Sequence, residues 1–381
     1  MSGLARVEPV ITGPPARVMI CDDSATIRSA IARMLESDRG IQVVAKVSNG
    51  RMAIEELKRT KVDVLVLDIE MPVLDGMAAL PLLLQEDPGL RVIMASTLTT
   101  RGADIAMRAL RMGAADYVPK PSTIGATTDD RFRVEIISKV KGLARLRQRA
   151  ALPVRPAVPS MTRPAPVLPP KLLAIGSSTG GPQALFTLIQ ALGRSVTVPI
   201  ILTQHMPATF TPILAEHITR LGGLPCAEAK DGEPLLPGQI YLAPGDKHLI
   251  IEHGDGTAAG RSAGKDFGYR GTSGNVMARA RLSTDPPENF CRPAVDPMLR
   301  SAASVCDGRV LVTMLTGMGH DGLAGTRRVV EAGGAAIAQD EATSVVWGMP
   351  GAIAQAGLCH AVLPLQRIAP KLLEMLRVPT K

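Results

Sequence analysis

The stretch Val64-Leu65-Val66-Leu67-Asp68 decides the fold class of the first half of this chain. Its four consecutive apolar residues predict a strand that is buried on both faces, as in parallel sheets covered by helices. The carboxylate follows at the carboxyl end of the strand, which is the edge where ligands bind in such sheets. This stretch therefore predicts an α/β protein with a polar site at one sheet edge.

Four more runs of strand length lie on either side of this stretch, and helical patterns separate them. Residues 27–35, for example, repeat their apolar positions at the spacing of a helix. The five predicted strands are Val18–Cys21, Gln42–Val47, Val62–Leu67, Arg91–Ala95 and Ala115–Val118. Five such βα units predict a doubly wound parallel sheet.

Reactive side chains stand directly after these strands. Asp22 and Asp23 follow the first strand, Asp68 the third, Ser96 the fourth and Lys120 the fifth. Parallel strands bring these ends to one edge, where clustered carboxylates favour a hard cation such as Mg²⁺. Single residues of these types are common as helix caps, but five at the correct ends predict a site for an acyl phosphate on the third-strand carboxylate.

Residues 16–140 resemble a response-regulator receiver domain. The matching elements are the Asp22-Asp23 pair, Asp68 before Met71-Pro72 and Asp75-Gly76, Ser96, and Tyr117 with Lys120-Pro121. The resemblance implies a flavodoxin-like fold in which a histidine kinase phosphorylates Asp68, while Mg²⁺ is held by Asp22, Asp23 and Asp68. It also implies that Ser96 and Tyr117 change position on phosphorylation, and that Lys120 contacts the phosphoryl group.

A basic, proline-rich segment divides the chain in two. Residues 151–170 contain seven prolines, and residues 131–170 carry nine basic side chains against one acidic, which matches the net charge of +8 of the chain. Proline removes a backbone donor and disfavours helix at the preceding residue, so an extended linker is predicted. We expect a receiver domain at 16–140, a linker at 141–170 and a second domain at 171–381. The charges predict a solvated linker, and attraction to an acidic partner is the alternative.

Composition excludes several classes of protein. Hydrophobic residues make up 46% of the chain and aromatic residues only 2%, so aliphatic cores are expected and stacking platforms for single-stranded nucleic acid are not. No apolar run approaches the length of a membrane span, and the first 15 residues lack the apolar core of a secretory signal. Five scattered cysteines without a Cys-x-x-Cys pair suit a reducing compartment, so a cytoplasmic protein is expected.

The second half opens with a strand that runs into Gly176-Ser-Ser178-Thr-Gly180. This Gly-x-Ser-x-Gly spacing is typical of a turn that exposes a serine nucleophile, although a glycine-rich loop before a helix also suits a phosphate.

A serine nucleophile needs a base and an acid that orients the base. His205 follows the predicted strand Val198–Thr203, and Asp321 follows Val310–Thr316, so both should reach the same edge. His248, close to another turn, remains a rival base.

The loop Gly317-x-Gly319-x-x-Gly322 offers a competing interpretation, because it fits the dinucleotide-binding fingerprint. Asp340 follows at a distance suited to a ribose-binding acid. Too few residues remain after it for the other strands of such a domain, and the fingerprint leaves the serine and histidine without a role.

The second half, residues 171–381, resembles the catalytic domain of the chemotaxis protein-glutamate methylesterase family. The matching motifs are Ile175–Gly181, Gln204–Pro207, Tyr241 with Ala243-Pro244, Arg292–Asp296, and Leu315–Gly322. The resemblance implies a Rossmann-like domain in which Ser178 is the nucleophile, His205 the general base and Asp321 its orienter. It also implies that the Met318 backbone amide contributes to the oxyanion hole.

The same resemblance implies a function and its partners. The substrates would be γ-glutamyl methyl esters on chemoreceptors, and certain receptor glutamines would be deamidated to glutamate. The partners would be these receptors and a chemotaxis histidine kinase, with neither nucleic acid nor membrane insertion. Mg²⁺ would serve the receiver, and the esterase step would need no cofactor. The alternatives are a phosphorylation-regulated esterase for another ester, and a transcriptional regulator, whose DNA-binding module the near-neutral βα pattern of the second half does not match.

Overall fold

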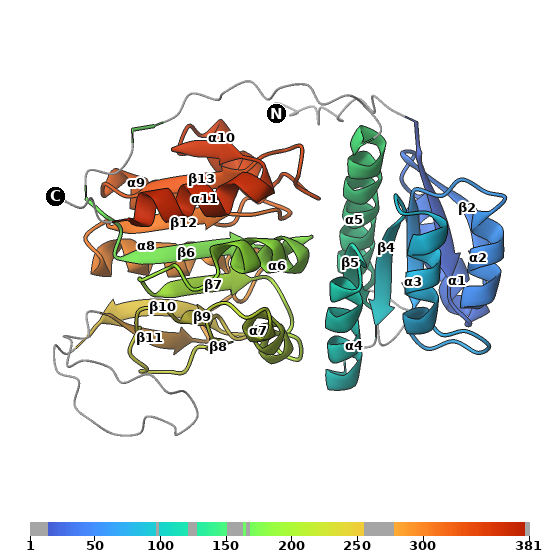
Figure 1. Ribbon diagram of the computed structural model, residues 1–381, viewed down its shortest axis with the longest axis horizontal. Helices are drawn as coiled ribbons and strands as arrows, with labels where there is room; N and C mark the ends of the chain where they lie inside the picture. The colour runs from blue at the N-terminus through green and yellow to red at the C-terminus, as the bar shows by residue number, and fades with distance from the viewer. Residues whose placement is uncertain are drawn as a thin grey trace, which may run out of the picture. The chain divides into compact units, whose positions relative to one another are not determined.

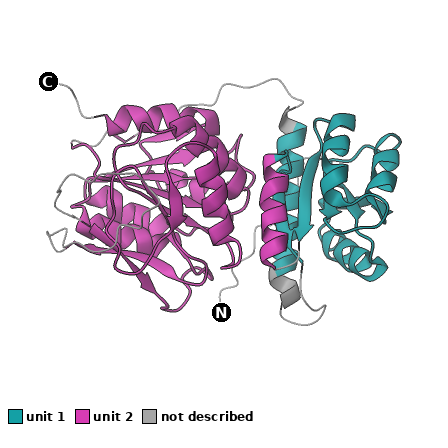
Figure 2. Cartoon of the chain, turned by 60° about the horizontal axis from the view of Figure 1, so that its bottom comes forward, with its two compact units in different colours: residues 1–96, 112–152 teal, residues 97–111, 153–381 magenta. Residues whose placement is uncertain are grey.

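The computed structural model describes residues 14–96, 99–120, 128–150, 163–164, 168–254 and 278–377. Most of the predicted linker, and Pro121 of the receiver motif, lie outside the described residues. The chain divides into two compact units, residues 1–96 with 112–152 and residues 97–111 with 153–381 (Figure 2). These units differ from the expected domain boundaries mainly in residues 97–111 and 141–152.

The first sheet has five parallel strands in the order β2-β1-β3-β4-β5, with helices between them along the chain (Figure 1). The strands are β1 Ala16–Cys21, β2 Ile41–Val47, β3 Val64–Asp68, β4 Arg91–Ser96 and β5 Asp116–Pro119. The helices are α1 Ala25–Glu36, α2 Gly50–Leu57, α3 Gly76–Glu86, α4 Thr100–Arg111 and α5 Thr128–Ala150. All five predicted strands and the doubly wound parallel fold are confirmed.

Local sequence explains where the helices of this sheet begin. The side chains of Ser24, Asn49 and Asp75 accept hydrogen bonds from the first-turn amides of α1, α2 and α3. Such caps satisfy amides that have no partner within the helix. Each cap stands just beyond a strand end or turn, so the strand edges that carry the predicted site also start helices.

The linker was expected to begin at residue 141, and this expectation is wrong. Residues 141–150 are the last turns of α5. Leu143 and Ala144 are buried there and continue the apolar face of the helix. Arg147 adds an ion pair with Asp87, at 2.8 Å between Nη2 and Oδ2. Burial of this face outweighs the charge of the segment and keeps it helical.

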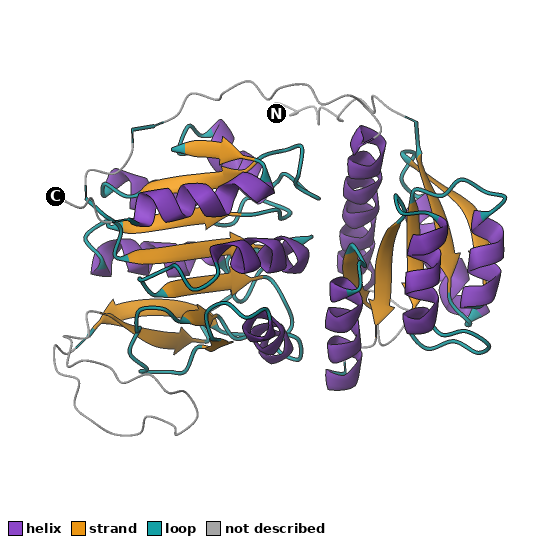
Figure 3. Cartoon of the chain, viewed as in Figure 1, coloured by secondary structure: helices purple, strands orange, loops and turns teal. Residues whose placement is uncertain are grey.

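The second sheet has seven strands in the order β14-β13-β12-β6-β7-β9-β8, and all neighbours are parallel (Figure 3). Its strands are β6 Leu172–Ser177, β7 Ile200–Gln204, β8 Cys226–Glu228, β9 Ile240–Leu242, β12 Val310–Met314, β13 Ala335–Gln339 and β14 Ala361–Leu363. Two further strands, β10 His248–His253 and β11 Ala278–Ser283, form a separate antiparallel pair. The helices are α6 Gly181–Leu192, α7 Thr211–Arg220, α8 Val295–Val305, α9 Leu323–Glu331, α10 Met349–Gln355 and α11 Leu365–Leu376.

The centre of this sheet positions the candidate site. Strand β6 lies between β12 and β7, and its residues Leu172–Ser177 are all buried. Because the three strands run in the same direction, the segments that follow them meet at one edge (Figure 1). This confirms the expected Rossmann-like parallel arrangement of the second half. Along the described residues, every helix is too short or too polar to span a lipid bilayer.

Candidate active site and phosphorylation site

The predicted nucleophile, Ser178, follows β6 in a turn that hydrogen bonds hold in place. Its backbone amide donates to the Thr316 carbonyl at 3.0 Å. Gln204 lies at the end of β7. Its Oε1 accepts a hydrogen bond of 2.7 Å from the Ser177 hydroxyl, and its Nε2 donates one of 2.9 Å to the Ser178 carbonyl. The same amide group of Gln204 donates to the His205 carbonyl at 3.1 Å. Gln204 therefore ties the serine turn to the histidine that follows the neighbouring strand.

Two glycines allow the loops around the serine to approach one another. Gly180 adopts a φ of +72°, and a Cβ atom there would lie 2.4 Å from Cγ2 of Val345. A Cβ on Gly317 would lie 2.9 Å from Cβ of Ser178 and 2.4 Å from Sδ of Met349. These spacings explain why the sequence has glycine at both positions.

The loop after β12 is held by a neighbouring segment that contains the single tryptophan. Gly317 forms a bridge with Trp347, and its amide donates to the Val346 carbonyl at 2.9 Å. The Trp347 indole N–H donates to the Gln339 carbonyl, also at 2.9 Å. The loop that carries Met318 is thus fixed to the end of β13.

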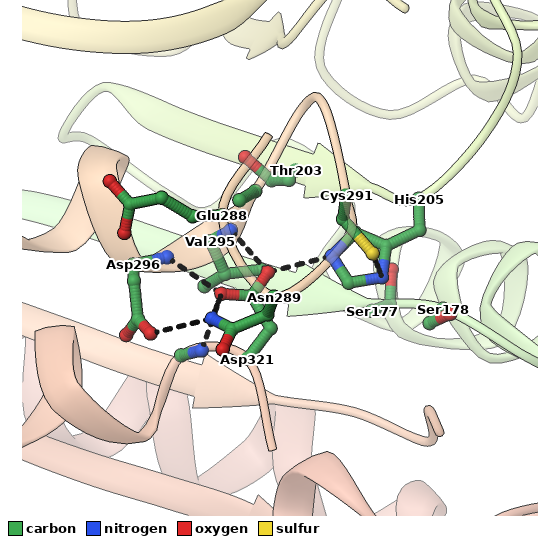
Figure 4. A network of polar contacts seen from close by, with 12 residues as sticks. Ser177, Ser178, Thr203, His205, Glu288, Asn289, Cys291, Val295, Asp296 and Asp321 are labelled. Atoms are coloured by element: carbon green, nitrogen blue, oxygen red, sulfur yellow. Dashed lines mark hydrogen bonds and ion pairs between the residues drawn. The ribbon is translucent and has the colours of Figure 1, made fainter. Parts of the chain in front are cut away.

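The predicted base and acid are brought together. Nε2 of His205 lies 2.7 Å from Oδ2 of Asp321, and both side chains are largely buried (Figure 4). The Asp321 carboxylate also accepts hydrogen bonds from three backbone amides, those of Val295 at 2.6 Å, Asp296 at 3.1 Å and Gly322 at 2.9 Å. The first two amides belong to the N-terminus of α8, where backbone N–H groups lack helical partners and favour an anion.

This environment shifts the pKa values of both groups toward their charged forms. Burial alone would lower the pKa of His205, but the hydrogen bond to Asp321, together with the contact to Cys291, raises it to about 9. Burial would raise the pKa of Asp321, but hydrogen bonds from His205 and the α8 amides lower it instead. The pair is therefore an ion pair at neutral pH.

The geometry assigns different tasks to the two nitrogens of His205. Nε2 is engaged by Asp321, so Nδ1 is the nitrogen left for a proton from Ser178. Nδ1 lies 3.4 Å from Sγ of Cys291. Figure 4 shows Ser178 on the side of the ring away from Asp321. Within the described chain, Oγ of Ser178 forms no hydrogen bond, so the serine is close to the base without being bonded to it.

The predicted oxyanion donor, Met318, lies in the loop after β12. Its backbone N–H has no acceptor among the residues that the structure describes. The neighbouring Gly317 amide, in contrast, is engaged by Val346. The Met318 side chain is 38% exposed, so the loop is open to a substrate. An amide without a partner beside the serine suits stabilisation of a developing negative charge.

The rival base His248 has a structural position. Its Nδ1 accepts the Ala294 amide at 3.1 Å, and its Nε2 donates to the Pro286 carbonyl at 3.2 Å. The side chain is almost fully buried. Because both ring nitrogens are committed to the backbone, His248 has no nitrogen left to accept a proton.

Three residues of the site were not found by sequence reasoning. Nδ2 of Asn289 donates to Oδ2 of Asp296 and to Oδ1 of Asp321, both at 3.0 Å (Figure 4). Cys291 contacts the base, as described above. Asp296 belongs to a motif that the sequence analysis matched to a family without giving the residue a role. No strand end or spacing marks Asn289 or Cys291, which lie in a short turn.

The competing dinucleotide interpretation finds no support around Asp340. Its Oδ1 accepts the Thr343 amide at 2.9 Å and the Thr343 hydroxyl at 2.7 Å. Oδ1 of this carboxylate is therefore committed to a local turn instead of being free for a ribose hydroxyl.

The reactive residues of the first sheet also meet at one edge. Carboxylate oxygens of Asp22, Asp23 and Asp68 all lie within 4.8 Å of one another. Nζ of Lys120 lies 2.7 Å from Oδ2 of Asp22 and 2.7 Å from Oδ1 of Asp68. Three hard oxygen donors at this spacing fit a single divalent cation such as Mg²⁺.

Charge and burial compete in this cluster. Burial raises the pKa of Asp68, and the ammonium of Lys120 only partly opposes this effect. Burial would lower the pKa of Lys120, but hydrogen bonds to Asp22 and Asp68 raise it. The lysine therefore stays charged and holds the two carboxylates together.

The two predicted switch residues are buried near this cluster. The Ser96 carbonyl accepts the Lys120 amide at 2.6 Å, so the end of β4 is joined to the lysine segment. The Tyr117 ring is buried on β5, with Nζ of Lys139 at 5.0 Å from its centre.

Comparison with known proteins identifies both halves. Residues 173–372 match the CheB methylesterase family, and residues 18–129 match the response regulator receiver domain. The chain is 51% identical to protein-glutamate methylesterase/protein-glutamine glutaminase 1 of Paramagnetospirillum magneticum, over 94% of this chain and 96% of the relative. It is 53% identical to the protein-glutamate methylesterase/protein-glutamine glutaminase of Azospirillum brasilense, over 94% and 92%. The crystal structure of the Thermotoga maritima CheB methylesterase catalytic domain is 36% identical, with a TM-score of 0.48, over 55% of this chain and 100% of that one.

These matches first define a class: a response regulator in which a receiver domain precedes an ester-hydrolysing domain. Within that class, the chain belongs to the CheB methylesterase family.

Proposed function

We propose that this enzyme hydrolyses γ-glutamyl methyl esters on chemoreceptors, deamidates specific receptor glutamines to glutamate, and is activated by phosphorylation of its receiver domain. The names of its relatives support the two reactions. The observation that carries the catalytic assignment is the His205–Asp321 pair, which stands at the same sheet edge as Ser178.

The proposed reaction is acyl transfer through the serine. Oγ of Ser178 attacks the ester carbonyl while Nδ1 of His205 takes its proton. Asp321, hydrogen bonded at Nε2, stabilises the imidazolium that forms. The Met318 amide donates to the oxyanion, and His205 protonates the departing methoxide, which leaves as methanol. Water then cleaves the acyl-enzyme by the same steps, with water in place of the serine hydroxyl. A glutamine side chain follows the same path, with ammonia as the leaving group.

The proposed control site is the acidic cluster of the first sheet. A histidine kinase would transfer its phosphoryl group to Asp68, the carboxylate at the end of β3. Lys120, which already contacts Asp68, would hold a phosphoryl oxygen. Asp22, Asp23 and Asp68 would hold Mg²⁺, which supplies positive charge against the transferred group. Ser96 and Tyr117 would change position when the phosphoryl group arrives.

We assign the receiver domain to residues 16–140 together with the rest of α5, and the catalytic domain to residues 171–381. The linker then covers 151–170. Its first described residue, Arg163, is already part of the second unit, and the Arg163 amide donates to the Cys359 carbonyl at 3.1 Å. We propose that the chain acts in the cytoplasm on the receptors of one chemosensory array.

One experiment tests the catalytic and regulatory parts together. Membranes with receptors that carry labelled methyl groups are mixed with the full chain, with or without a small-molecule phosphodonor, and released methanol is measured. The phosphodonor should raise the rate about 5- to 150-fold, as a coupling free energy of about 1–3 kcal/mol would. Asp68→Ala should remove this rise, and Ser178→Ala should remove release altogether. Release by the Ser178 variant would contradict the catalytic assignment, and stimulation of the Asp68 variant the regulatory one.

A further inference from the structure

A tight turn between β11 and α8 contacts the proposed acid and the proposed base at the same time. The turn spans Glu288–Cys291. The Glu288 amide donates to the Cys291 carbonyl at 3.1 Å, and the Cys291 amide donates to the Glu288 carbonyl at 2.8 Å. Asn289 and Phe290 are its two central residues, with φ values of 52° and 63°. Positive φ at both central residues is the geometry of the tightest two-residue turns.

Ion pairs on both sides anchor the turn. The guanidinium of Arg300, on α8, pairs with both carboxylate oxygens of Glu288 at 2.5 and 2.9 Å. Arg292 pairs with Asp246, at 2.6 Å between Nη2 and Oδ1. A two-pronged guanidinium–carboxylate pair fixes orientation as well as distance. The turn is therefore held in a defined place relative to α8.

From this place Asn289 reaches the acid. Its side-chain amide donates one hydrogen bond to Asp321 and another to Asp296. Asp296 is itself anchored, because its Oδ1 accepts the Gly325 amide at 2.6 Å. Burial is the largest cause of the raised pKa of Asp296. The negative charge of the neighbouring Asp321 raises this pKa further, because two carboxylates repel each other. The Asn289 amide bridges the two and keeps Asp321 directed toward the base.

From the other end of the turn Cys291 reaches the base. Its Sγ lies 3.4 Å from Nδ1 of His205, the nitrogen that Asp321 leaves free. Cys291 is partly exposed, whereas the other four cysteines of the chain are buried. A thiol sulfur is a weak hydrogen-bond acceptor, so it can hold the Nδ1–H of the imidazolium and still give way to a serine hydroxyl.

We propose that the turn Glu288–Cys291 is a positioning element of the catalytic site, in which Asn289 orients the acid and Cys291 orients the base. This inference rests on the proposed roles of His205 and Asp321. In the resting enzyme the imidazolium donates its Nδ1–H to the Cys291 sulfur, which keeps the ring from turning about its χ2 axis. When substrate is bound and Nδ1 has lost its proton to solvent, Ser178 displaces the thiol from Nδ1 and hands over its own proton. Neither Asn289 nor Cys291 touches the substrate.

The first test is a kinetic comparison of full-length variants, read by methanol release at saturating phosphodonor. Cys291→Ala should lower kcat about 3- to 10-fold and leave KM unchanged. A factor of this size corresponds to the loss of one weak hydrogen bond. Cys291→Ser keeps an acceptor and should lose less. Asn289→Ala should lower kcat by a similar factor. In the double variant, kcat should fall by less than the product of the two factors, because both residues position the same His205–Asp321 pair.

The pH profile separates positioning from a general structural role. Asp321 and Cys291 are the groups that face the His205 ring, and both raise its pKa. In Cys291→Ala the acidic limb of the kcat/KM profile should therefore move to lower pH. Phe290→Ala is the matched control from the same turn, because the Phe290 side chain is 90% exposed, and its profile should not move. An unchanged kcat and profile in Cys291→Ala and Asn289→Ala, or an equal shift in Phe290→Ala, would overturn the proposal.

A second test needs no substitution in the treated enzyme. Methyl methanethiosulfonate transfers its CH₃S group to a thiolate: a new S–S bond forms at Cys291, methanesulfinate leaves, and the thiol proton goes to solvent. After removal of the reagent, methanol release should fall at least about tenfold, because the added group occupies the space beside Nδ1. A reducing agent should restore it. Cys291→Ala retains the four buried cysteines and should resist the reagent.

These outcomes distinguish the inference from the proposed function. If labelled Cys291 leaves the rate unchanged, or if Cys291→Ala is inhibited as strongly as the parent, the positioning role is wrong while the enzyme still releases methanol. If the untreated parent releases no methanol, the proposed function itself fails.

Discussion

Oδ2 of Asp321 accepts a hydrogen bond of 2.6 Å from the backbone amide of Val295, the first residue of α8. The acid of the candidate site is thus held by a helix terminus as well as by the base. Its charge does not depend on His205 being protonated, because the α8 amides independently favour the carboxylate. A variant without the imidazole should therefore keep the acid in place, and its defect should be chemical.

Loss of the nucleophile should abolish turnover without unfolding the domain. Ser178→Ala removes a hydroxyl that forms no hydrogen bond within the described chain, so the free energy of unfolding should change by less than about 0.5 kcal/mol. Methanol release should fall about 10⁴- to 10⁶-fold. His205→Gln should lose activity to a similar extent. More than a tenth of the parental rate in Ser178→Ala would exclude the serine as nucleophile.

His248→Gln should separate structural from catalytic histidine. Both ring nitrogens of His248 bond to backbone groups near the start of α8, so a substitution leaves a buried amide without its partner. We expect a loss of about 1–3 kcal/mol in the free energy of unfolding and a rate of methanol release that stays near that of the parent. A large loss of kcat in a folded, stable His248 variant would reverse the assignment of the base.

Activity should rise with pH because the base is protonated at neutral pH. With a pKa of about 9 for His205, only about 1% of the free enzyme carries a neutral imidazole at pH 7. The kcat/KM for methanol release should therefore increase about tenfold per pH unit until about pH 9. A plateau that begins near pH 6.5 would show that Asp321 does not hold the imidazolium.

The raised pKa of His205 should make the folded state less stable as the pH rises, in contrast to its effect on activity. A pKa raised from 6.5 to about 9 contributes stability that is fully present below about pH 6.5 and is lost as the pH rises through about 9. Denaturant unfolding of the parent should therefore show a decrease over this range that His205→Gln lacks. Activity and stability should change in opposite directions between these two pH values.

Lys120→Arg should uncouple phosphorylation from its effect. The Lys120 ammonium fits between Asp22 and Asp68 at 2.7 Å from each, and a planar guanidinium is too large to take that place. Labelled phosphate from a phosphodonor should still be incorporated, because Asp68 remains. The stimulation of methanol release should fall below about twofold, against the 5- to 150-fold rise expected for the parent. Asp68→Ala, which should incorporate nothing, is the control for the labelling, and full stimulation of the arginine variant would contradict the proposed role.

Gly317→Ala should damage the site through one methyl group. The added Cβ would meet Cβ of Ser178 at 2.9 Å and Sδ of Met349 at 2.4 Å, so the loop must shift. A displacement of about 1 Å costs on the order of 10²-fold in rate, and overpacking about 1–3 kcal/mol in stability. A rate of methanol release in Gly317→Ala that equals the parental rate would show that the contact with Ser178 is unimportant.

Strand ends were the part of the site that could be predicted from sequence. An apolar run followed by a reactive residue indicates a strand and its edge, and parallel pairing then determines which residues meet. This reasoning placed Ser178, His205 and Asp321 at one edge, where the structure has them. It equally placed Asp68 beside Lys120, and both relations depend only on strand direction.

What the sequence could not show is how side chains orient at that edge. Nothing in the motif around His205 indicates that Nε2, not Nδ1, faces the acid, because this depends on where α8 presents its amides. Asn289 and Cys291 were missed because their turn has no periodicity and its partners lie far away in the sequence. The helical residues 141–150 were missed because their charge was given more weight than their buried apolar face.

The segment around Trp347 provides an optical probe of the site. The chain contains one tryptophan, and its backbone is bridged to Gly317, in the loop that carries Met318. Intrinsic fluorescence excited in the indole band therefore originates from the segment that is bridged to this loop. A change in emission wavelength or anisotropy on adding a phosphodonor would follow the environment of the catalytic loop in real time, in the unlabelled, full-length enzyme.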